Sequence, residues 1–329
     1  MKAIVYARYG SPDVLQVKNV EQPTPGKNEV LIRVYAAEAT KGDCELRSFN
    51  FPVKWFWLPL RLAWGISRPR KRILGGYFSG VVECVGEAVT RLKQGDEVFG
   101  VSKLLMGAYA EYICLPEKYP IVPKPDNMSF TEAAAVPLGG LNALHFLSKA
   151  NIQAGEKVLV NGAGGSIGTF AVQIAKAMGA EVTVVDSGIK QAMLNNIGAD
   201  HFIDYTKNNY VSSGQTWDVI FDMVAGSDLL KSIDALSSGG RYVTANPTFK
   251  KMISAGKIFK KTGKKVITAF AGELEEELLT LKSMIEKGEV RAAVDKVFPM
   301  EEAAEAHRRV ETEQRIGIVV ISMTGDKNE

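Results

Sequence analysis

The chain has 329 residues, which is too long for one small domain and enough for two domains that each bury a core. Hydrophobic residues make up 46% and charged residues 23%, so the composition excludes an intrinsically disordered or fibrous chain. A formal net charge of +3 provides no global field that would indicate a nucleic-acid-binding protein.

The three cysteines, Cys44, Cys84 and Cys114, are odd in number and widely spaced. This predicts neither a disulfide framework nor a close-spaced zinc cluster, and it favours a reducing, cytoplasmic location. Met1 leads directly into a β-type run, so we expect no secretory leader. The longest apolar stretch, 55–66, is too short for a membrane span, and none is expected.

The first 120 or so residues alternate short β-type runs with turn residues, as in 30–34, 80–85 and 109–113. This pattern predicts a β-rich domain. From Ser129 onward the apolar spacing becomes helical and then alternates between strand and helix, which is typical of a parallel sheet covered on both faces. We expect its six strands at 157–160, 181–185, 201–203, 219–222, 241–244 and 266–269.

Six strands with crossover helices predict an α/β, doubly wound dinucleotide-binding fold. A helix near 273–286 is followed by a β-type run at 316–321, which we expect to return to the first domain. The predicted domains are therefore 1–123 with 290–329, and 124–289.

A glycine-rich turn joins the first strand of the second domain to its first helix. The turn comprises Gly162, Ala163, Gly164, Gly165, Ser166, Ile167 and Gly168. Small residues let a backbone approach a pyrophosphate, whose charge is met by N–H groups and the positive end of the helix. The alternative is a tight connection that binds nothing, but the flanking strand and helix favour a nicotinamide dinucleotide.

The end of the second strand gives conflicting evidence about which dinucleotide binds. Asp186 can hydrogen-bond the adenosine ribose and repel a 2′-phosphate, which favours NAD(H). Ser187 and Lys190 can instead hold a 2′-phosphate, which favours NADP(H). The alternative for all three is a solvated loop, and the choice of dinucleotide stays open at this point.

Several motifs occur in one order along nearly the whole chain: 95–100 (GDEVFG), 107–112 (GAYAEY), 133–137 (AAAVP), 198–201 (GADH), 239–241 (GGR) and 306–307 (AH). Together with the glycine turn they resemble the medium-chain dehydrogenase/reductase superfamily, in particular its zinc-free quinone oxidoreductase and enoyl reductase-like branch. The resemblance implies a GroES-like substrate domain wrapped by both ends of the chain and a Rossmann domain. Val224 and Asn246 complete the residues expected to contact the cofactor.

The positions of the catalytic zinc ligands in zinc-dependent relatives carry other residues here. The resemblance places them at Thr40, at Gly76 with Tyr77, and at or near Leu138, and none supplies a thiolate or imidazole. The four-cysteine structural zinc lobe is also missing from 99–109. We therefore expect a zinc-independent reductase that transfers hydride to a quinone or an α,β-unsaturated carbonyl. The alternatives are an alcohol or aldehyde dehydrogenase and a non-catalytic redox sensor that binds NAD(P)H.

The resemblance also places Thr40, Asp43 and Asn142 near nicotinamide and substrate, where Thr40 and Asn142 are candidate hydrogen-bond donors. For Asp43 the alternative to a direct role is a structural hydrogen bond that orders the turn at 40–44. The Tyr77 phenol is a further candidate donor, and its alternative role is packing. We expect packing roles for the three histidines, His145, His201 and His307.

Two unusual segments have no place in this account. Residues 49–64 contain three of the four tryptophans, and we consider a lid over a bulky substrate, a satellite core, or a membrane or partner surface. Residues 250–265 contain seven lysines and are expected to form a solvated connection, with an acidic partner or an anionic membrane surface as the alternative. The strand that follows is expected at the sheet edge and predicts a homodimer.

Overall fold

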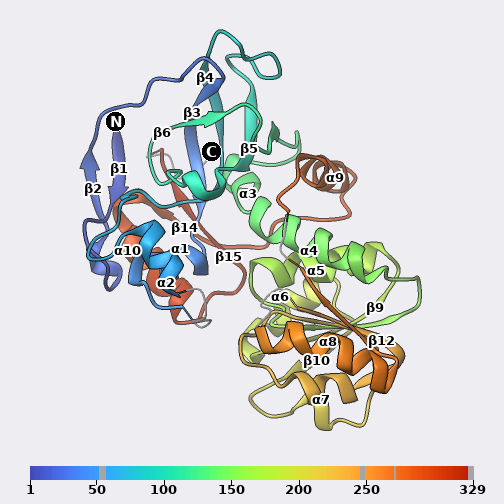
Figure 1. The fold of residues 1–329 in the computed structure, drawn as a ribbon. Helices are drawn as coiled ribbons and strands as arrows, with labels where there is room; N and C mark the ends of the chain where they lie inside the picture. The colour runs from blue at the N-terminus through green and yellow to red at the C-terminus, as the bar shows by residue number, and fades with distance from the viewer. Residues whose placement is uncertain (52–56, 245–248, 270–271, 325–329) are drawn as a thin grey trace. The chain divides into compact units, whose positions relative to one another are not determined.

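The computed structural model describes residues 1–51, 57–244, 249–269 and 272–324, and the chain forms two compact units (Figure 1). Unit 1 comprises residues 1–138, 274–286 and 294–329, and unit 2 comprises 139–273 and 287–293. Residues 124–138 and 274–286 thus group with unit 1, whereas the sequence placed them in the second domain. No described helix is long and apolar enough to span a bilayer.

Unit 1 is built on a seven-stranded sheet, as the β-type runs predicted. The strand order is β14 (Val294–Pro299), β15 (Ile318–Ser322), β3 (Glu29–Glu38), β4 (Tyr77–Val85), β5 (Glu97–Val101) and β7 (Ile121–Pro123), and β6 (Tyr112–Pro116) pairs with the first half of β3. The run expected from 109 becomes a strand only at Tyr112. The C-terminal strand β15 pairs with β3, so the predicted return of the chain to its first domain is confirmed.

Five helices and a β-hairpin accompany this sheet. The hairpin is β1 (Lys2–Val5) with β2 (Gln16–Asn19), and the helices are α1 (Lys41–Ser48), α2 (Trp57–Trp64), α3 (Phe130–Ala134), α9 (Glu275–Glu286) and α10 (Ala303–Glu311). Capping boxes start α1 at Thr40 and α3 at Ser129. Each cap hydroxyl accepts from the backbone N–H of the third helical residue, and the acidic side chain of that residue accepts from the backbone N–H of the cap. The core of unit 1 lies between the sheet, α1 and α10.

Unit 2 is a doubly wound parallel sheet with all six predicted strands. Their order is β10 (His201–Asp204), β9 (Glu181–Asp186), β8 (Lys157–Asn161), β11 (Trp217–Asp222), β12 (Leu236–Thr244) and β13 (Lys265–Thr268). The helices are α4 (Pro137–Ala150), α5 (Ser166–Ala177), α6 (Gln191–Asn196), α7 (Leu229–Asp234) and α8 (Phe249–Thr262). The order reverses between β8 and β11, where such sheets bind ligands at the carboxyl ends of their strands.

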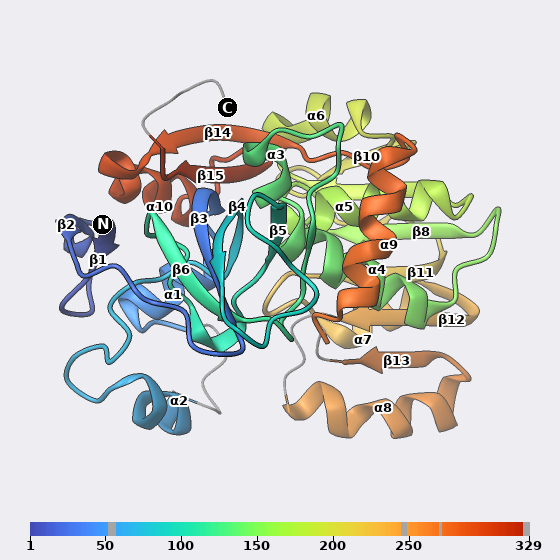
Figure 2. The same ribbon diagram turned by 90° about the horizontal axis from the view of Figure 1, so that it is seen from above.

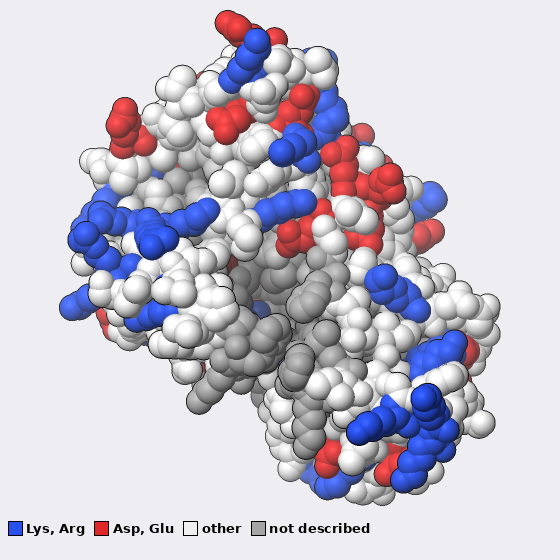
Figure 3. Space-filling model, in the orientation of Figure 1, with Lys and Arg blue, Asp and Glu red and all other residues white. Residues whose placement is uncertain are grey.

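The two unusual segments are now partly explained. Phe49, Phe51 and Trp64 are buried in the core of unit 1, whereas Trp57 and its neighbours in α2 are exposed. Residues 52–56, including Trp55, lie outside the described residues. The lysine-rich segment is largely the helix α8, and Figure 3 shows Lys and Arg side chains gathered over the part of unit 2 where Figure 1 places α7 and α8.

Candidate active site

The glycine turn of unit 2 leads from β8 directly into α5. Gly162 has a φ of +86°, a conformation that favours glycine, and its N–H and that of Ala163 donate to the Val185 carbonyl. A Cβ at Gly168 would lie 2.4 Å from the Ala163 carbonyl oxygen, so only glycine permits this approach. The helix starts after Gly165 without a side-chain cap. This bare helix N-terminus beside a close-packed backbone fits an anionic pyrophosphate.

Asp186 and Lys190 form a buried ion pair beside the turn. The Lys190 Nζ lies 3.0 Å from an Asp186 carboxylate oxygen, and both side chains are at most 7% exposed. The other carboxylate oxygen accepts from the Gly164 N–H at 2.7 Å, and the Ser187 N–H donates to the first at 2.8 Å. A Cβ at Gly164 would lie 2.2 Å from Lys190 Cδ, so the lysine chain runs directly over the turn.

A buried carboxylate that the sequence analysis missed organises the next strand end. Asp222 closes β11 and accepts from the Asn161 amide at 2.9 Å and from the Val224 N–H at 3.0 Å. The Tyr242 and Ser227 hydroxyls also donate to it. Val224 consequently lies against the turn, with Cγ2 3.2 Å from a Cβ built at Gly162. The sequence signal for this site was an aspartate at the end of a central apolar strand.

The remaining predicted residue of the cofactor set, Asn246, lies outside the described residues. Asn142 belongs to α4 of unit 2 and is half-buried. Tyr77 begins β4 of unit 1, opposite Val101, and is also half-buried.

Thr40 and Asp43 are joined at the start of α1. The Thr40 hydroxyl donates to Asp43 Oδ2 at 2.6 Å and accepts from the Asp43 N–H at 2.9 Å. The Asp43 carboxylate also accepts from the Gly75 N–H at 3.1 Å and from the Tyr109 hydroxyl at 3.1 Å. Burial raises the pKa of Asp43, and these hydrogen bonds oppose the rise. Asp43 thus makes the hydrogen bonds that order the turn at 40–44.

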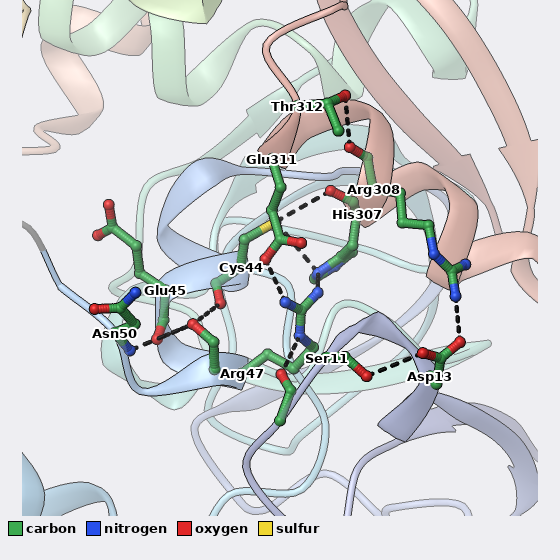
Figure 4. Close-up of polar contacts among 12 residues, drawn as sticks. Ser11, Asp13, Cys44, Glu45, Arg47, Asn50, His307, Arg308, Glu311 and Thr312 are labelled. Atoms are coloured by element: carbon green, nitrogen blue, oxygen red, sulfur yellow. Dashed lines mark hydrogen bonds and ion pairs between the residues drawn. The ribbon is translucent and has the colours of Figure 1, made fainter.

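A buried polar network continues from Asp43 through Tyr109 to His307 of α10, and Figure 4 shows its part around Arg47, His307 and Glu311. Arg47 donates to His307 Nδ1 at 3.1 Å, to the Gly10 carbonyl, and to Glu311 at the half-buried end of the network. A guanidinium cannot accept, so Nδ1 is the acceptor and the neutral ring carries its hydrogen on Nε2. That nitrogen lies 3.3 Å from the Tyr109 oxygen. The donors therefore run in one order: Arg47 donates to His307, His307 donates to Tyr109, and Tyr109 donates to Asp43.

Burial shifts the pKa values of three groups in this network. Burial, and then the Arg47 charge, lower the pKa of His307 to about 3, so its imidazole is neutral at pH 7. Burial raises the pKa of the Cys44 thiol and that of the Tyr109 phenol, so both stay protonated. His307 is fully buried, and it lies at the centre of a hydrogen-bond network that the sequence did not indicate.

The donor set does not fit a catalytic zinc ion. Thr40 supplies a hydroxyl that is bound to Asp43, and Gly76 and Leu138 supply no donor at all. Within the described ranges no three His, Cys, Asp or Glu side chains gather as a metal site would require.

Comparison with known proteins covers both units of the chain. Residues 26–126 match the alcohol dehydrogenase GroES-like domain, and residues 197–321 match the zinc-binding dehydrogenase family. The chain is 32% identical to the 2-methylene-furan-3-one reductase of Solanum lycopersicum, over 98% of this chain and 79% of that protein. It is 30% identical to the quinone oxidoreductase of Pseudomonas aeruginosa, over 97% and 99% of the two chains. The chain belongs to the medium-chain dehydrogenase/reductase superfamily.

Within that superfamily the likeness is to the quinone oxidoreductase-like branch. The structure of the quinone oxidoreductase from Coxiella burnetii superposes with a TM-score of 0.85 at 29% identity, covering 98% of this chain and 99% of that one. This medium-chain dehydrogenase/reductase is therefore a nicotinamide-dependent oxidoreductase, as the glycine turn predicted. Its family description mentions zinc, but its own residues at the ligand positions do not fit that ion.

Proposed function

We propose that this medium-chain dehydrogenase/reductase uses NADPH to reduce quinones or α,β-unsaturated carbonyls without zinc. The observation that carries the proposal is the combination of a complete dinucleotide turn with zinc-ligand positions that hold no thiolate or imidazole. Without a Lewis acid, oxidation of a simple alcohol loses the main electrostatic stabilisation of its alkoxide, whereas an electron-poor double bond accepts hydride with the help of hydrogen-bond donors. Relatives named as quinone and alkenal/one oxidoreductases support the same substrate class.

The bound nicotinamide supplies the hydride, and the chain holds the cofactor and the substrate oxygen. In this proposal the first turn of α5 binds the pyrophosphate, and Gly168 lets the helix approach the backbone of the turn at Ala163. The Thr40 hydroxyl hydrogen is engaged by Asp43, so Thr40 acts by fixing the start of α1. The Asn142 amide then serves as the hydrogen-bond donor to the substrate carbonyl. In this proposal solvent delivers the proton, since burial raises the pKa of the Tyr109 phenol and keeps the His307 imidazole neutral.

The environment of Asp186 supports NADPH over NADH. Its carboxylate is neutralised by Lys190 and already accepts from two backbone amides, so little capacity is left for ribose hydroxyls. Binding NADH through Asp186 would separate a buried ion pair, which is costly. A 2′-phosphate would instead add a second anion to Lys190, beside the Ser187 hydroxyl.

Fluorescence titration with NADPH and NADH tests this preference. We expect Lys190→Gln to weaken NADPH binding by roughly ten- to a hundredfold, the worth of a hydrogen bond to a charged group, and to change NADH binding much less. The control is Lys231→Gln, which removes an exposed lysine from α7. Tighter binding of NADH by the wild type, or equal loss of both cofactors in Lys190→Gln, would contradict the NADPH assignment.

The substrate class is tested by following absorbance at the nicotinamide band with a quinone, an enone and an aldehyde, and in reverse with primary alcohols. We expect turnover of the quinone or enone that a zinc chelator does not change. Alcohol oxidation that is lost with the chelator and restored by zinc would refute the proposal. Tight cofactor binding with no turnover of any compound would identify a sensor.

The free edge of unit 2 supports a homodimer as part of this proposal. β13 is the last strand of its sheet and pairs with β12 within the described path. An edge strand presents unpaired backbone groups, which a two-fold copy can satisfy. Light scattering at micromolar concentration should give about twice the 35.8 kDa of the chain, and a monomeric mass would contradict the dimer.

A further inference from the structure

We propose that one surface of unit 1 binds anionic phospholipid bilayers, a property independent of the proposed reductase activity. This α2 surface consists of exposed apolar side chains and of the exposed arginines that follow α2 in the chain. The apolar members are Trp57, Leu58, Leu62, Ile66, Leu104 and Leu105, and the basic members are Arg68, Arg70 and Arg72.

The helix α2 is apolar on both of its faces. Its inner face packs Leu60 and Trp64 against the core of unit 1. Its outer face carries Leu58 and Leu62, one turn apart, which are 61% and 52% exposed. The outer face of a helix on a water-soluble protein is normally polar. Figure 2 shows α2 at the outer margin of unit 1, where this outer face meets solvent.

A second apolar segment lies beside the chain that leaves α2. Lys71 Nζ donates to the backbone carbonyls of Leu104 and Leu105, which joins the two segments. The bonds use the carbonyl groups and leave the Leu104 side chain 71% exposed. Ile66, just after α2, is 63% exposed. The exposed apolar side chains thus come from two chain segments that Lys71 joins.

The charges of the chain segment that contains α2 have one sign. Residues 57–72 contain five Arg or Lys and no acidic residue, and the acid-free stretch extends from 46 to 82. Arg68, Arg70 and Arg72 are exposed, and none of them pairs with a carboxylate in the part of the chain that the structure describes. Figure 3 shows Lys and Arg side chains beside uncharged surface in the region where Figure 1 places α2 and α10.

Arg61 differs from these arginines because it holds the helix in place. Its guanidinium lies 4.3 Å from the Tyr9 ring centroid and 4.2 Å from that of Phe49. These two ring contacts hold α2 against unit 1, so its outer face keeps its orientation toward solvent.

An anionic bilayer matches this combination of features. Trp and Leu side chains enter the interface between headgroups and acyl chains, and arginines beside them meet lipid phosphates. An eight-residue helix is too short to cross the bilayer and suits a position in its surface plane. An acidic protein partner would use the arginines but would not require so many exposed aliphatic side chains.

Flotation of the whole protein with vesicles tests the proposal. The probes are vesicles of phosphatidylcholine alone and of phosphatidylcholine with an equal share of phosphatidylglycerol. We expect flotation with the anionic vesicles only, and weakening by high salt. The triple variant Arg68→Gln, Arg70→Gln, Arg72→Gln should bind about a hundredfold more weakly, given the effect of each basic residue near such a surface.

Two further variants separate the possible causes. Leu58→Gln with Leu62→Gln keeps the charge and should lower anionic-vesicle binding by about tenfold or more. The matched control, Lys257→Gln, Lys260→Gln, Lys261→Gln, removes the same charge from exposed positions of α8 and should bind like the wild type. An unchanged cofactor titration in each variant verifies that it is folded.

Absence of wild-type flotation would overturn the proposal, as would an α8 control that loses as much binding as the arginine variant. The proposal would also be overturned if the double leucine variant bound anionic vesicles like the wild type and soluble polyglutamate with the same affinity. That result would indicate an acidic protein partner. Failure of the enzyme assays would leave vesicle binding unaffected, so the two proposals fail separately.

Discussion

Replacing His307 by glutamine is expected to remove most of one acid-sensitive contribution to the free energy of unfolding. The buried ring has a pKa of about 3 in the folded protein and 6.5 when unfolded. The unfolded chain therefore binds the extra proton between these values, so the contribution is complete above pH 6.5 and is lost as the pH falls toward 3. From the pKa difference, lowering the pH from 8 to 5 costs the wild type about 2 kcal/mol through this residue.

Glutamine is the suitable replacement because it keeps an acceptor for Arg47 and a donor for Tyr109 but does not titrate. Urea unfolding of both proteins between pH 5 and 8 measures the difference. The variant should be less stable at pH 8, and the gap should shrink by about 2 kcal/mol at pH 5. His201→Gln, which changes an exposed histidine beside Glu181, is the comparison variant for the loss of an imidazole. A gap for His307→Gln that is the same at every pH would refute the neutral, buried imidazole.

Three further predictions follow from single contacts. Gly168→Ala places a methyl group 2.4 Å from the Ala163 carbonyl, so titration should show lost NADPH binding, with a stability cost of about 2 kcal/mol; Gly256→Ala, which meets no neighbour in α8, is the control and should not destabilise. Burial raises the pKa of Glu45 to about 7, above its unfolded value of 4.5, so this residue's contribution falls as pH rises between these values. Glu45→Gln should thus be more stable than wild type at pH 8 but not at pH 4.5 in the same urea assay, and a gain at both would contradict this. Arg47→Met leaves a buried imidazole and a carboxylate without their shared donor and should cost about 3 kcal/mol, measured by urea unfolding at pH 7; a loss below about 1 kcal/mol, the level of an exposed ion pair, would contradict the buried network.

The sequence was sufficient where structure follows from neighbouring residues. The six strands of unit 2 and the turn between β8 and α5 were all located, because strand patterns and small-residue turns are local signals. Asp186 and Lys190 are four residues apart, a spacing at which two side chains can pair. In the sequence they favour opposite cofactors, whereas in the structure they form one ion pair.

Contacts between distant segments were beyond the reach of the sequence alone. Asp43 receives hydrogen bonds from Gly75 and Tyr109, and the network continues to His307, which lies more than 260 residues farther along the chain. No local pattern connects these positions, since only the tertiary fold brings α10 against α1. The exposed outer face of α2 was likewise undecided between three interpretations until its burial was known.

The pairing of β15 with β3 also constrains the order in which the protein can form on the ribosome. Val320 pairs with Glu38, so a strand made early waits for a partner synthesised about 280 residues later. At typical elongation rates that delay is roughly 15 to 60 s. The strands of unit 2 lie within 157–268 and are complete well before then. The unit that contains the start of the chain is thus the last to close, and until then the free edge of β3 is a target for chaperones or misassociation during synthesis.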